Sequence, residues 1–267
     1  MRASLAIFRM RFIHSLQYRA AAWAGVSTQV FWGFMEVLLY KAFYEGSAAA
    51  FPMTFTQITS YIWLRQAFFA LFLLWSVDAD ILEMIKDGNV AYEIIRPADL
   101  YSLWFFRNLG SRLSKAALRC GPIFVIGFLL PKPYGLSLPP DLAAAAGFLI
   151  SFAMACFLII GMCMWIYVLT FYTVASKGVQ NIVGSIADFL AGSLIQIPLM
   201  PAAVQKVLYW LPFASSQSLP YLIYNGYFRG PEVWFQLARQ FVWMVLVIGS
   251  GYLMMQKALR RVIIQGG

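Results

Sequence analysis

The sequence predicts an all-α membrane protein that crosses the bilayer several times. Of its 267 residues, 61% are hydrophobic and 12% are charged, and the mean hydropathy is +0.72. A soluble domain carries about 25% charged residues. The apolar runs are roughly 20 residues long and do not alternate as barrel strands do. In lipid, such runs satisfy their backbone groups by forming helices.

Six apolar runs are candidates for spanning helices, and we expect them to form a single transmembrane domain over residues 1–267. They cover residues 21–43, 58–77, 112–131, 142–171, 179–200 and 233–256. The third run begins with Arg112, Lys115 and Arg119, whose long side chains are expected to reach toward the interface. The fourth run is longer than a bilayer requires, so we expect it to tilt or to extend into water.

Residues 2–19, before the first run, combine apolar and basic side chains. Leu5, Phe8, Phe12 and Leu16 follow a helical spacing, and four arginines accompany them, Arg2, Arg9, Arg11 and Arg19. This pattern predicts an amphipathic helix lying in the membrane interface. The alternative is a plain basic lead into the first span.

The distribution of lysine and arginine predicts the orientation. With the six runs as spans, fourteen of the 20 basic residues fall on the side of the amino terminus and four on the other, while Arg65 and Arg239 lie within spans. Because basic residues concentrate in cytoplasmic loops, both termini are predicted to be cytoplasmic. The net charge of +9 then reflects membrane orientation, not nucleic-acid binding.

This orientation places residues 198–232 outside, just before the last span. The segment is rich in proline and aromatic residues, and its apolar runs are too short to span. It predicts short re-entrant helices whose loose backbone groups are buried by protein. The alternative is an aromatic belt at the interface.

Residues 78–99 (DADILEMIKDGNVAYEIIRPAD) hold six of the eleven acidic residues and are predicted to be cytoplasmic. Asp80 and Glu83 form a capping-box pattern, and Gly88 and Asn89 suit a left-handed helix stop. We therefore expect a two-turn helix over residues 80–87. Asp99 is expected to cap a longer helix that runs into the third span.

The short helix would carry an apolar face with an acidic rim. The face consists of Ile81, Met84 and Ile85, and the rim of Asp80, Glu83 and Asp87. Only other loops of the chain are expected near it, so the face predicts docking of a cytoplasmic partner. A helix resting on the bilayer is the alternative, which the anionic inner leaflet disfavours.

The run EMIKDGNVAYEIIRPADLYSLWFFRNLGSRL resembles permease subunits of ABC-2 type ABC exporters. The most specific positions are Ile85, Gly88, Asn89, Tyr92, Glu93, Arg96, Pro97 and Asp99. The predicted spans, the basic first helix and the outer segment extend the resemblance over essentially the whole chain. It implies a connecting helix over residues 2–19, a coupling segment over 78–111 and re-entrant helices over 198–232.

The resemblance also implies the partners. The coupling helix would sit in a cleft of an ATPase subunit, with Asp80, Ile81, Glu83, Met84, Ile85, Asp87, Gly88 and Asn89 at the contact. The sequence has no G-x-x-x-x-G-K-[ST] phosphate loop. A separate ATPase pair would therefore bind ATP and magnesium, while this chain would bind no cofactor and catalyse no reaction. A second permease, identical or paralogous, would complete the exporter in a bacterial-type inner membrane.

Two stripes of side chains are candidates for the translocation path, since the resemblance implies that the second and fifth spans line it. The fifth run has Asn181, Ser185, Asp188, Gly192 and Gln196 on one helical face, and the second has Tyr61, Arg65, Phe68 and Phe72. A carboxylate at mid-span costs about 2.5–3.5 kcal/mol, so Asp188 must face protein or water. Helix–helix hydrogen bonding and ordinary packing are the alternatives.

Arg65 has two possible partners, Glu36 and Asp188, or it points outward. A charge pair would relieve the cost of burying both groups. These three groups also leave open an ion-coupled secondary transporter or channel, although no inverted repeat is visible. A membrane-embedded enzyme is disfavoured by one histidine, His14, and three scattered cysteines, Cys120, Cys156 and Cys163, which are expected to act as small apolar residues.

Overall fold

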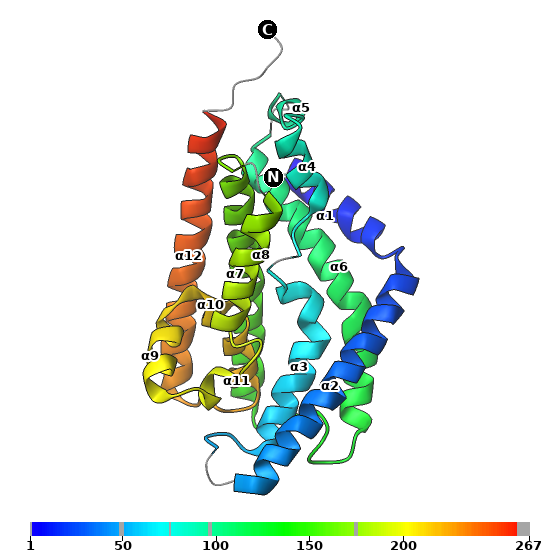
Figure 1. Ribbon diagram of the computed structural model, residues 1–267, viewed down its shortest axis with the longest axis vertical. Helices are drawn as coiled ribbons and strands as arrows, with labels where there is room; N and C mark the ends of the chain where they lie inside the picture. Colours follow the sequence, from blue (N-terminus) through cyan, green and yellow to red (C-terminus); the bar gives the residue numbers. More distant parts are fainter. Residues whose placement is uncertain (1, 48–50, 75, 96–97, 174–175, 261–267) are drawn as a thin grey trace.

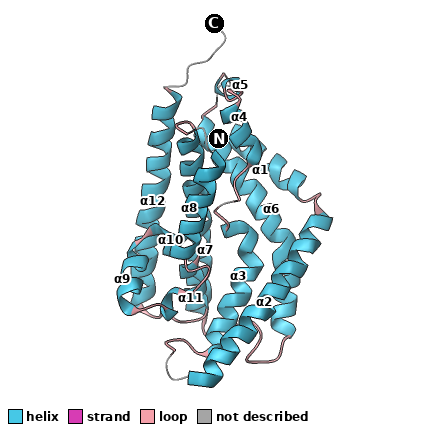
Figure 2. Cartoon of the chain, in the orientation of Figure 1, coloured by secondary structure: helices cyan, strands magenta, loops and turns pink. Residues whose placement is uncertain are grey.

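The protein, seen here in a computed structural model, is built of helices joined by loops (Figures 1 and 2). The structure describes residues 2–47, 51–74, 76–95, 98–173 and 176–260, and no strand occurs within those ranges. The predicted all-α class is therefore confirmed.

Six helices correspond in order to the six predicted runs. They are α2 (Arg19–Ser47), α3 (Phe55–Phe72), α6 (Leu100–Leu129), α7 (Leu142–Thr170), α8 (Ser176–Leu190) and α12 (Pro231–Leu259). In the described part of the chain, α7 and α12 are both long and apolar enough to cross a membrane. Helices α2 and α6 have 29 and 30 residues, or roughly 45 Å at 1.5 Å per residue. That all six helices span the bilayer stays a prediction.

The helices pack in two neighbouring groups. Helix α12 lies along α7, while α3 packs on both α2 and α6. The first turn of α1 (Arg2–Ser15), the short helix α4 (Ala79–Lys86) and the end of α12 lie at one end of the long axis, whereas α9 (Ala202–Trp210) and α11 (Ser218–Tyr224) lie toward the other (Figure 1). This arrangement separates the two segments that the sequence analysis assigned to opposite sides.

Helix α1 crosses α6 at Gly110. A Cβ atom at Gly110 would lie 2.6 Å from the carbonyl oxygen of Phe8, so only glycine permits this close approach. Leu5 is 64% exposed while Ser4 is buried, so Leu5 lies off the side of α1 that packs on α6, and the placement of α1 in the membrane interface stays a prediction. The crossing point, not the apolar spacing, decides which side of α1 is covered.

Polar caps fix where the helices begin. The carboxylate of Asp99 accepts a hydrogen bond of 2.8 Å from the amide of Ser102, which confirms the predicted cap of α6. Thr54 and Gln57 form a reciprocal capping box at the start of α3. These caps satisfy amide groups that the first helical turn leaves without partners.

Two predicted helices end early. Helix α3 stops at Phe72 instead of residue 77, and Arg112 donates hydrogen bonds to the carbonyl groups of Leu71 and Leu73 at this end. Helix α8 stops at Leu190 and not at residue 200. Just after its end, Gly192 adopts a left-handed backbone with φ 76°. Glycine accepts this conformation without steric cost, so the chain turns here.

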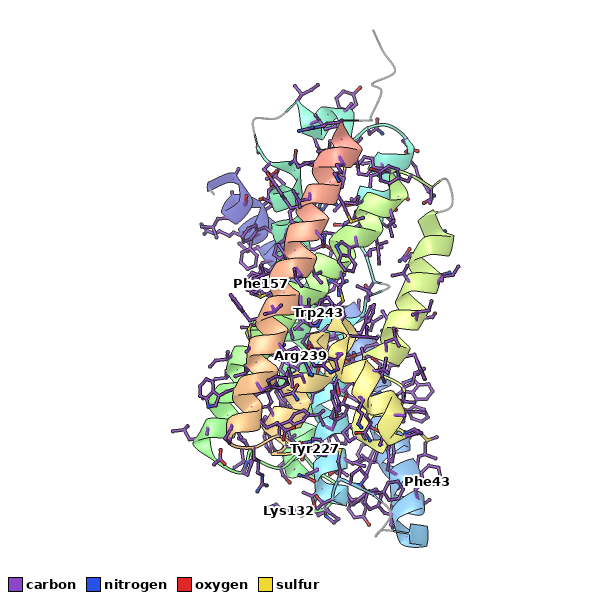
Figure 3. The ribbon with its side chains drawn as sticks, turned by 90° about the vertical axis from the view of Figure 1, so that its left-hand side faces the viewer. Phe43, Lys132, Phe157, Tyr227, Arg239 and Trp243 are labelled. Carbon is purple, nitrogen blue, oxygen red and sulfur yellow. The ribbon has the colours of Figure 1, made fainter. Side chains whose placement is uncertain are left out.

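Short helices occupy the segment before α12, as predicted. They are η2 (Ile197–Leu199), α9, α10 (Pro212–Ser216) and α11. Their loose carbonyl groups are bonded by protein: Gln205 donates to Pro198 and Met200, and Gln240 of α12 donates to Ser215. Arg239 and Trp243, one turn apart on α12, lie beside this segment (Figure 3), and Trp243 donates to the carbonyl of Trp210.

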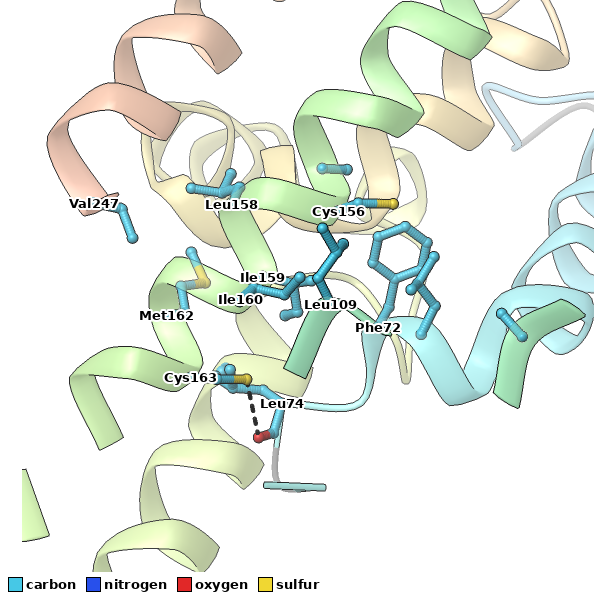
Figure 4. Close-up of a cluster of buried hydrophobic side chains, with 14 of the residues drawn as sticks. Phe72, Leu74, Leu109, Cys156, Leu158, Ile159, Ile160, Met162, Cys163 and Val247 are labelled. Atoms are coloured by element: carbon cyan, nitrogen blue, oxygen red, sulfur yellow. Dashed lines mark hydrogen bonds between the residues drawn. The ribbon is translucent and has the colours of Figure 1, made fainter. Parts of the chain in front are cut away.

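The hydrophobic core lies where α3, α6 and α7 meet. Phe72, Leu109 and Ile159 pack there with Cys156 (Figure 4). Cys156 and Cys163 are buried, as expected of small apolar residues, although Cys163 also accepts a hydrogen bond from Arg112. The core therefore joins the body of the protein to the segment that leads from α3 into α4.

Candidate functional site

The acidic segment forms two short helices, α4 and α5 (Ala91–Ile94). The cap of α4 is Asp78, whose carboxylate accepts from the amide of Asp80, so the prediction that Asp80 caps the helix is wrong by two residues. Asp78 takes this role because the chain is still extended there. Gly88, with φ 74°, ends the helical stretch as predicted.

Arg107 of α6 attaches α4 to the helical body. Its Nε donates to Asp78 Oδ2 at 2.6 Å, and its Nη2 donates to Asp78 Oδ1 at 3.0 Å and Asp80 Oδ2 at 2.7 Å. Arg11 of α1 lies 3.6 Å from the same carboxylate of Asp80. One arginine side chain, largely buried, thus fixes the first turn of α4 with directional bonds.

Further hydrogen bonds tie the segment to α7. The amide of Asp78 donates to the hydroxyl of Tyr167 at 2.7 Å, and that hydroxyl donates to Asn108 at 3.1 Å. Trp104 donates its indole N–H to the carboxylate of Glu93 at 2.5 Å. The first half of the segment is held by α6 and α7 and the second half by α6, so a push on it would be transmitted to both helices.

The apolar face of α4 is turned mostly inward. Ile81 is fully buried and Leu82 nearly so, and Met84 and Ile85 pack partly against the core. The expectation that this face lacks a partner within the chain is wrong, because the end of α7 covers α4. The buried part of this face is therefore not available to a second protein.

The exposed part of the segment lies at its tip. Glu83, Asp87, Gly88 and Asn89 are exposed as the docking prediction requires, and so is Asp80 despite its ion pairs. The large apolar side chains that face outward are Tyr92, 72% exposed, and Ile95, 75% exposed. Arg96 and Pro97 of the motif lie outside the described residues. The exposed part of the segment thus carries apolar side chains at Tyr92 and Ile95 and acidic side chains at Glu83 and Asp87.

A second candidate site is a charged cavity of about 460 Å³ between α2, α3 and the end of α8. Glu36 and Arg65 form an ion pair on its wall, which is one of the pairings that the sequence allowed. Asp188 and Gln29 also line it. The side chains of Arg65 and Glu36 are 8% and 25% exposed, so the pair lies largely within the protein.

The predicted path residues divide between this cavity and other places. Arg65, Phe72 and Asp188 line the cavity. Tyr61 is buried against Ser218 and Tyr221, and Phe68 packs on Phe124 and Phe152, so neither lines this cavity, and their place in a path stays a prediction.

The stripe on the fifth run is broken. Asn181 and Ser185 are exposed on α8, Gly192 follows the end of the helix, and Gln196 is buried, where it accepts a hydrogen bond from Tyr40. The single helical face predicted for this run is therefore wrong beyond Leu190. Gln29 and Gln217 on the cavity wall were missed, because an isolated amide has no helical pattern that would reveal it.

Replacing Arg65 with methionine should lower the free energy of unfolding by about 2 kcal/mol, because Glu36 is left as a charge without its partner. Thermal unfolding in detergent measures the change. The double variant Arg65→Met with Glu36→Gln removes both charges and should recover most of the loss. Equal destabilisation by the single and the double variant would show that the ion pair does not matter.

The described residues contain no group of three or more His, Cys, Asp or Glu side chains placed to hold a metal ion. The interactions at both sites are hydrogen bonds and ion pairs between side chains that bind and position. Such side chains can bind another molecule and can hold helices in position as they move.

An apolar all-helical chain with a charged cavity among its helices has the make-up of a membrane transport protein. The chain belongs to the ABC-2 transporter family: the family model described as ABC-2 family transporter protein matches residues 30–266. A comparison with curated proteins found no match.

Family membership establishes several of the expected properties. The chain is membrane-embedded and is the membrane component of an ABC transporter, which is not itself an enzyme. Such components normally work with an ABC ATPase. Helix α1 lies outside the matched residues, whereas the acidic segment over 78–99 and the ion pair of Glu36 and Arg65 lie within them.

Proposed function

We propose that this chain is the membrane-spanning subunit of an ATP-driven exporter and that the tip of α4 and α5 receives the motion of a separate ATPase pair. The observation that carries the proposal is the attachment of α4 by Arg107, which joins an exposed tip to α6 through directional bonds. ATP and magnesium would bind to the ATPase subunits. A motion of the tip would then move α6 and α7 together.

The remaining parts of the proposal follow the same arrangement. Two permease subunits, identical or paralogous, would pair in a bacterial-type inner membrane with six spans each. The start of α1 and the end of α12 lie at the same end of the molecule as α4, which agrees with cytoplasmic termini (Figure 1). The cavity with Glu36, Arg65 and Asp188 would form part of the translocation path, and the segment over 198–232 would re-enter the outer leaflet. Alternation between inward- and outward-open states requires that ATP binding favour one of them.

Replacing Tyr92 and Ile95 together with alanine should lower chain-dependent ATPase activity by roughly tenfold or more. Exposed apolar anchors at the centre of an interface each contribute more than about 1 kcal/mol to binding. The measurement is ATPase activity of the complex purified through a tag on the full chain, with the Walker-containing subunit quantified in the same sample.

The matched control is Leu138→Ala with Leu142→Ala, two leucines that are 75% and 85% exposed away from α4. This control should leave ATPase activity unchanged. Normal activity in the Tyr92 and Ile95 variant, with both variants equally well inserted, would refute the assigned docking surface. Alanine at Ile81 is a poorer test, because that side chain is buried and its loss would destabilise the chain itself.

A further inference from the structure

A second cavity, of about 470 Å³, opens between α1, the start of α2, residues 76–79 and α6. Residues 76–79, which lead into α4, form part of its wall, and it shares no lining residue with the cavity of Glu36 and Arg65. Its wall has four cationic side chains and one carboxylate, namely Arg11, Arg112, Lys115, Arg119 and Asp78. The docking surface at the tip does not account for this concentration of positive charge.

Most of this charge is not neutralised by the protein. Asp78 is engaged by Arg107, and Arg11 faces Asp80. The other three cations, Arg112, Lys115 and Arg119, have no carboxylate partner within the described ranges. Their spacing of three and four residues places them along one face of α6. Arg112 is engaged by backbone carbonyl groups, so Lys115 and Arg119 are the cations that the cavity offers to an anion.

The guanidinium of Arg119 is packed against the protein, yet its Nε makes no hydrogen bond to any described residue. It rests on Gly25 of α2, where an added Cβ atom would lie 2.5 Å from Arg119 Cζ. The Nε of Arg119 and the Nε of Arg112 are buried and lack hydrogen-bond partners. Buried donors of this kind are costly unless an acceptor reaches them, and phosphate oxygens suit arginine well.

The helices that form one wall of the cavity also carry exposed apolar side chains. Leu5 and Ile13 of α1, Tyr18 in the following turn and Trp23 of α2 are all at least half exposed. Apolar side chains on a basic helix lie in the boundary between headgroups and acyl chains. An anion that enters the cavity from this side would arrive with a hydrocarbon part that these side chains can cover.

We propose that the cavity binds the phosphate-bearing headgroup of an anionic phospholipid, with the acyl chains along the exposed side chains of α1 and α2. Lys115 and Arg119 bind the phosphate, and Arg112 lies behind them. The lipid would then hold α1 beside residues 76–79, which begin the coupling segment. The orientation proposed above places this lipid in the cytoplasmic leaflet. Binding of the headgroup itself does not depend on docking of the ATPase.

The test is a native mass spectrometry titration of the full chain in detergent with phosphatidylglycerol and with phosphatidylcholine of the same acyl chains. Phosphatidylglycerol should bind more tightly. Lys115→Gln with Arg119→Gln should weaken that binding roughly 30-fold, since each basic residue near an anionic lipid contributes about fivefold. Lys177→Gln with Lys257→Gln removes two exposed lysines elsewhere and should leave the affinity unchanged.

A second variant tests the cavity without changing its charge. Ala21 is exposed on the cavity wall, and Ala21→Phe should fill part of the space and lower phosphatidylglycerol binding even if the charge variant fails to fold. Inorganic phosphate in a parallel titration should compete only weakly with the lipid. Equal binding of the two lipids, competition by inorganic phosphate at the lipid's own concentration, or wild-type affinity in Ala21→Phe would overturn the proposal.

Discussion

Replacing Arg107 with methionine should lower the free energy of unfolding by about 3–5 kcal/mol and abolish chain-dependent ATPase stimulation. Arg107 is largely buried and makes three charged hydrogen bonds to Asp78 and Asp80. Removing it leaves Asp78, which is itself mostly buried, as a charge without its partner, and this is the costly outcome for a buried pair. Thermal unfolding of the purified chain measures the first effect, and ATPase activity of the complex measures the second.

Two further variants separate the ion pair from general disruption. Arg107→Met with Asp78→Asn removes both charges and should recover part of the stability but not the coupling, because α4 loses its bonds to α6. Lys41→Met breaks an exposed pair with Glu45 and should change neither quantity. Wild-type ATPase stimulation in Arg107→Met would mean that α4 does not carry the motion.

Local sequence patterns predicted the helices and their caps better than the contacts between them. Asp99 begins α6 and Gly88 ends the α4 stretch where expected, because a cap depends on residues a few positions away. The burial of Ile81 was not foreseen. Helical spacing identifies residues that share a face, but the residues that cover α4 come from the end of α7, far along the sequence.

Helical spacing also did not predict which residues are exposed at the tip of the coupling segment. Tyr92 and Ile95 lie in a run with no clear helical or alternating pattern. Glu93 accepts a hydrogen bond from Trp104 of α6, yet Tyr92 and Ile95 point outward. A four-residue helix such as α5 is too short for periodicity to reveal its exposed side.

Arg112 is the residue whose role departs most from expectation. A cationic side chain near the start of a membrane span usually extends toward the interface. Here Arg112 is 3% exposed and turns inward, where it donates to the carbonyl groups of Leu71, Leu73 and Ser76. The early end of α3 frees these carbonyls, and that ending depends on packing that a local pattern does not show.

Arg112→Met should therefore destabilise the protein by at least about 3 kcal/mol, because three carbonyl groups lose their donor and each unsatisfied buried group costs about 1–3 kcal/mol. Thermal unfolding in lipid-free detergent measures the loss. Hydrogen exchange of peptides that join α3 to α4 should become faster, which locates the effect. Unchanged exchange in these peptides would argue against the role assigned to Arg112.

Arg112→Lys is the sharper variant, because it keeps the charge but loses the planar fork that reaches several acceptors at once. It should fall between the wild type and Arg112→Met in stability. Lys115→Met removes a neighbouring cation that is exposed, and should leave the exchange of the α3–α4 connection unchanged. If Arg112→Lys also loses ATPase stimulation, then the shape of the connection between α3 and α4, and not its charge, transmits motion from the tip into the helical body.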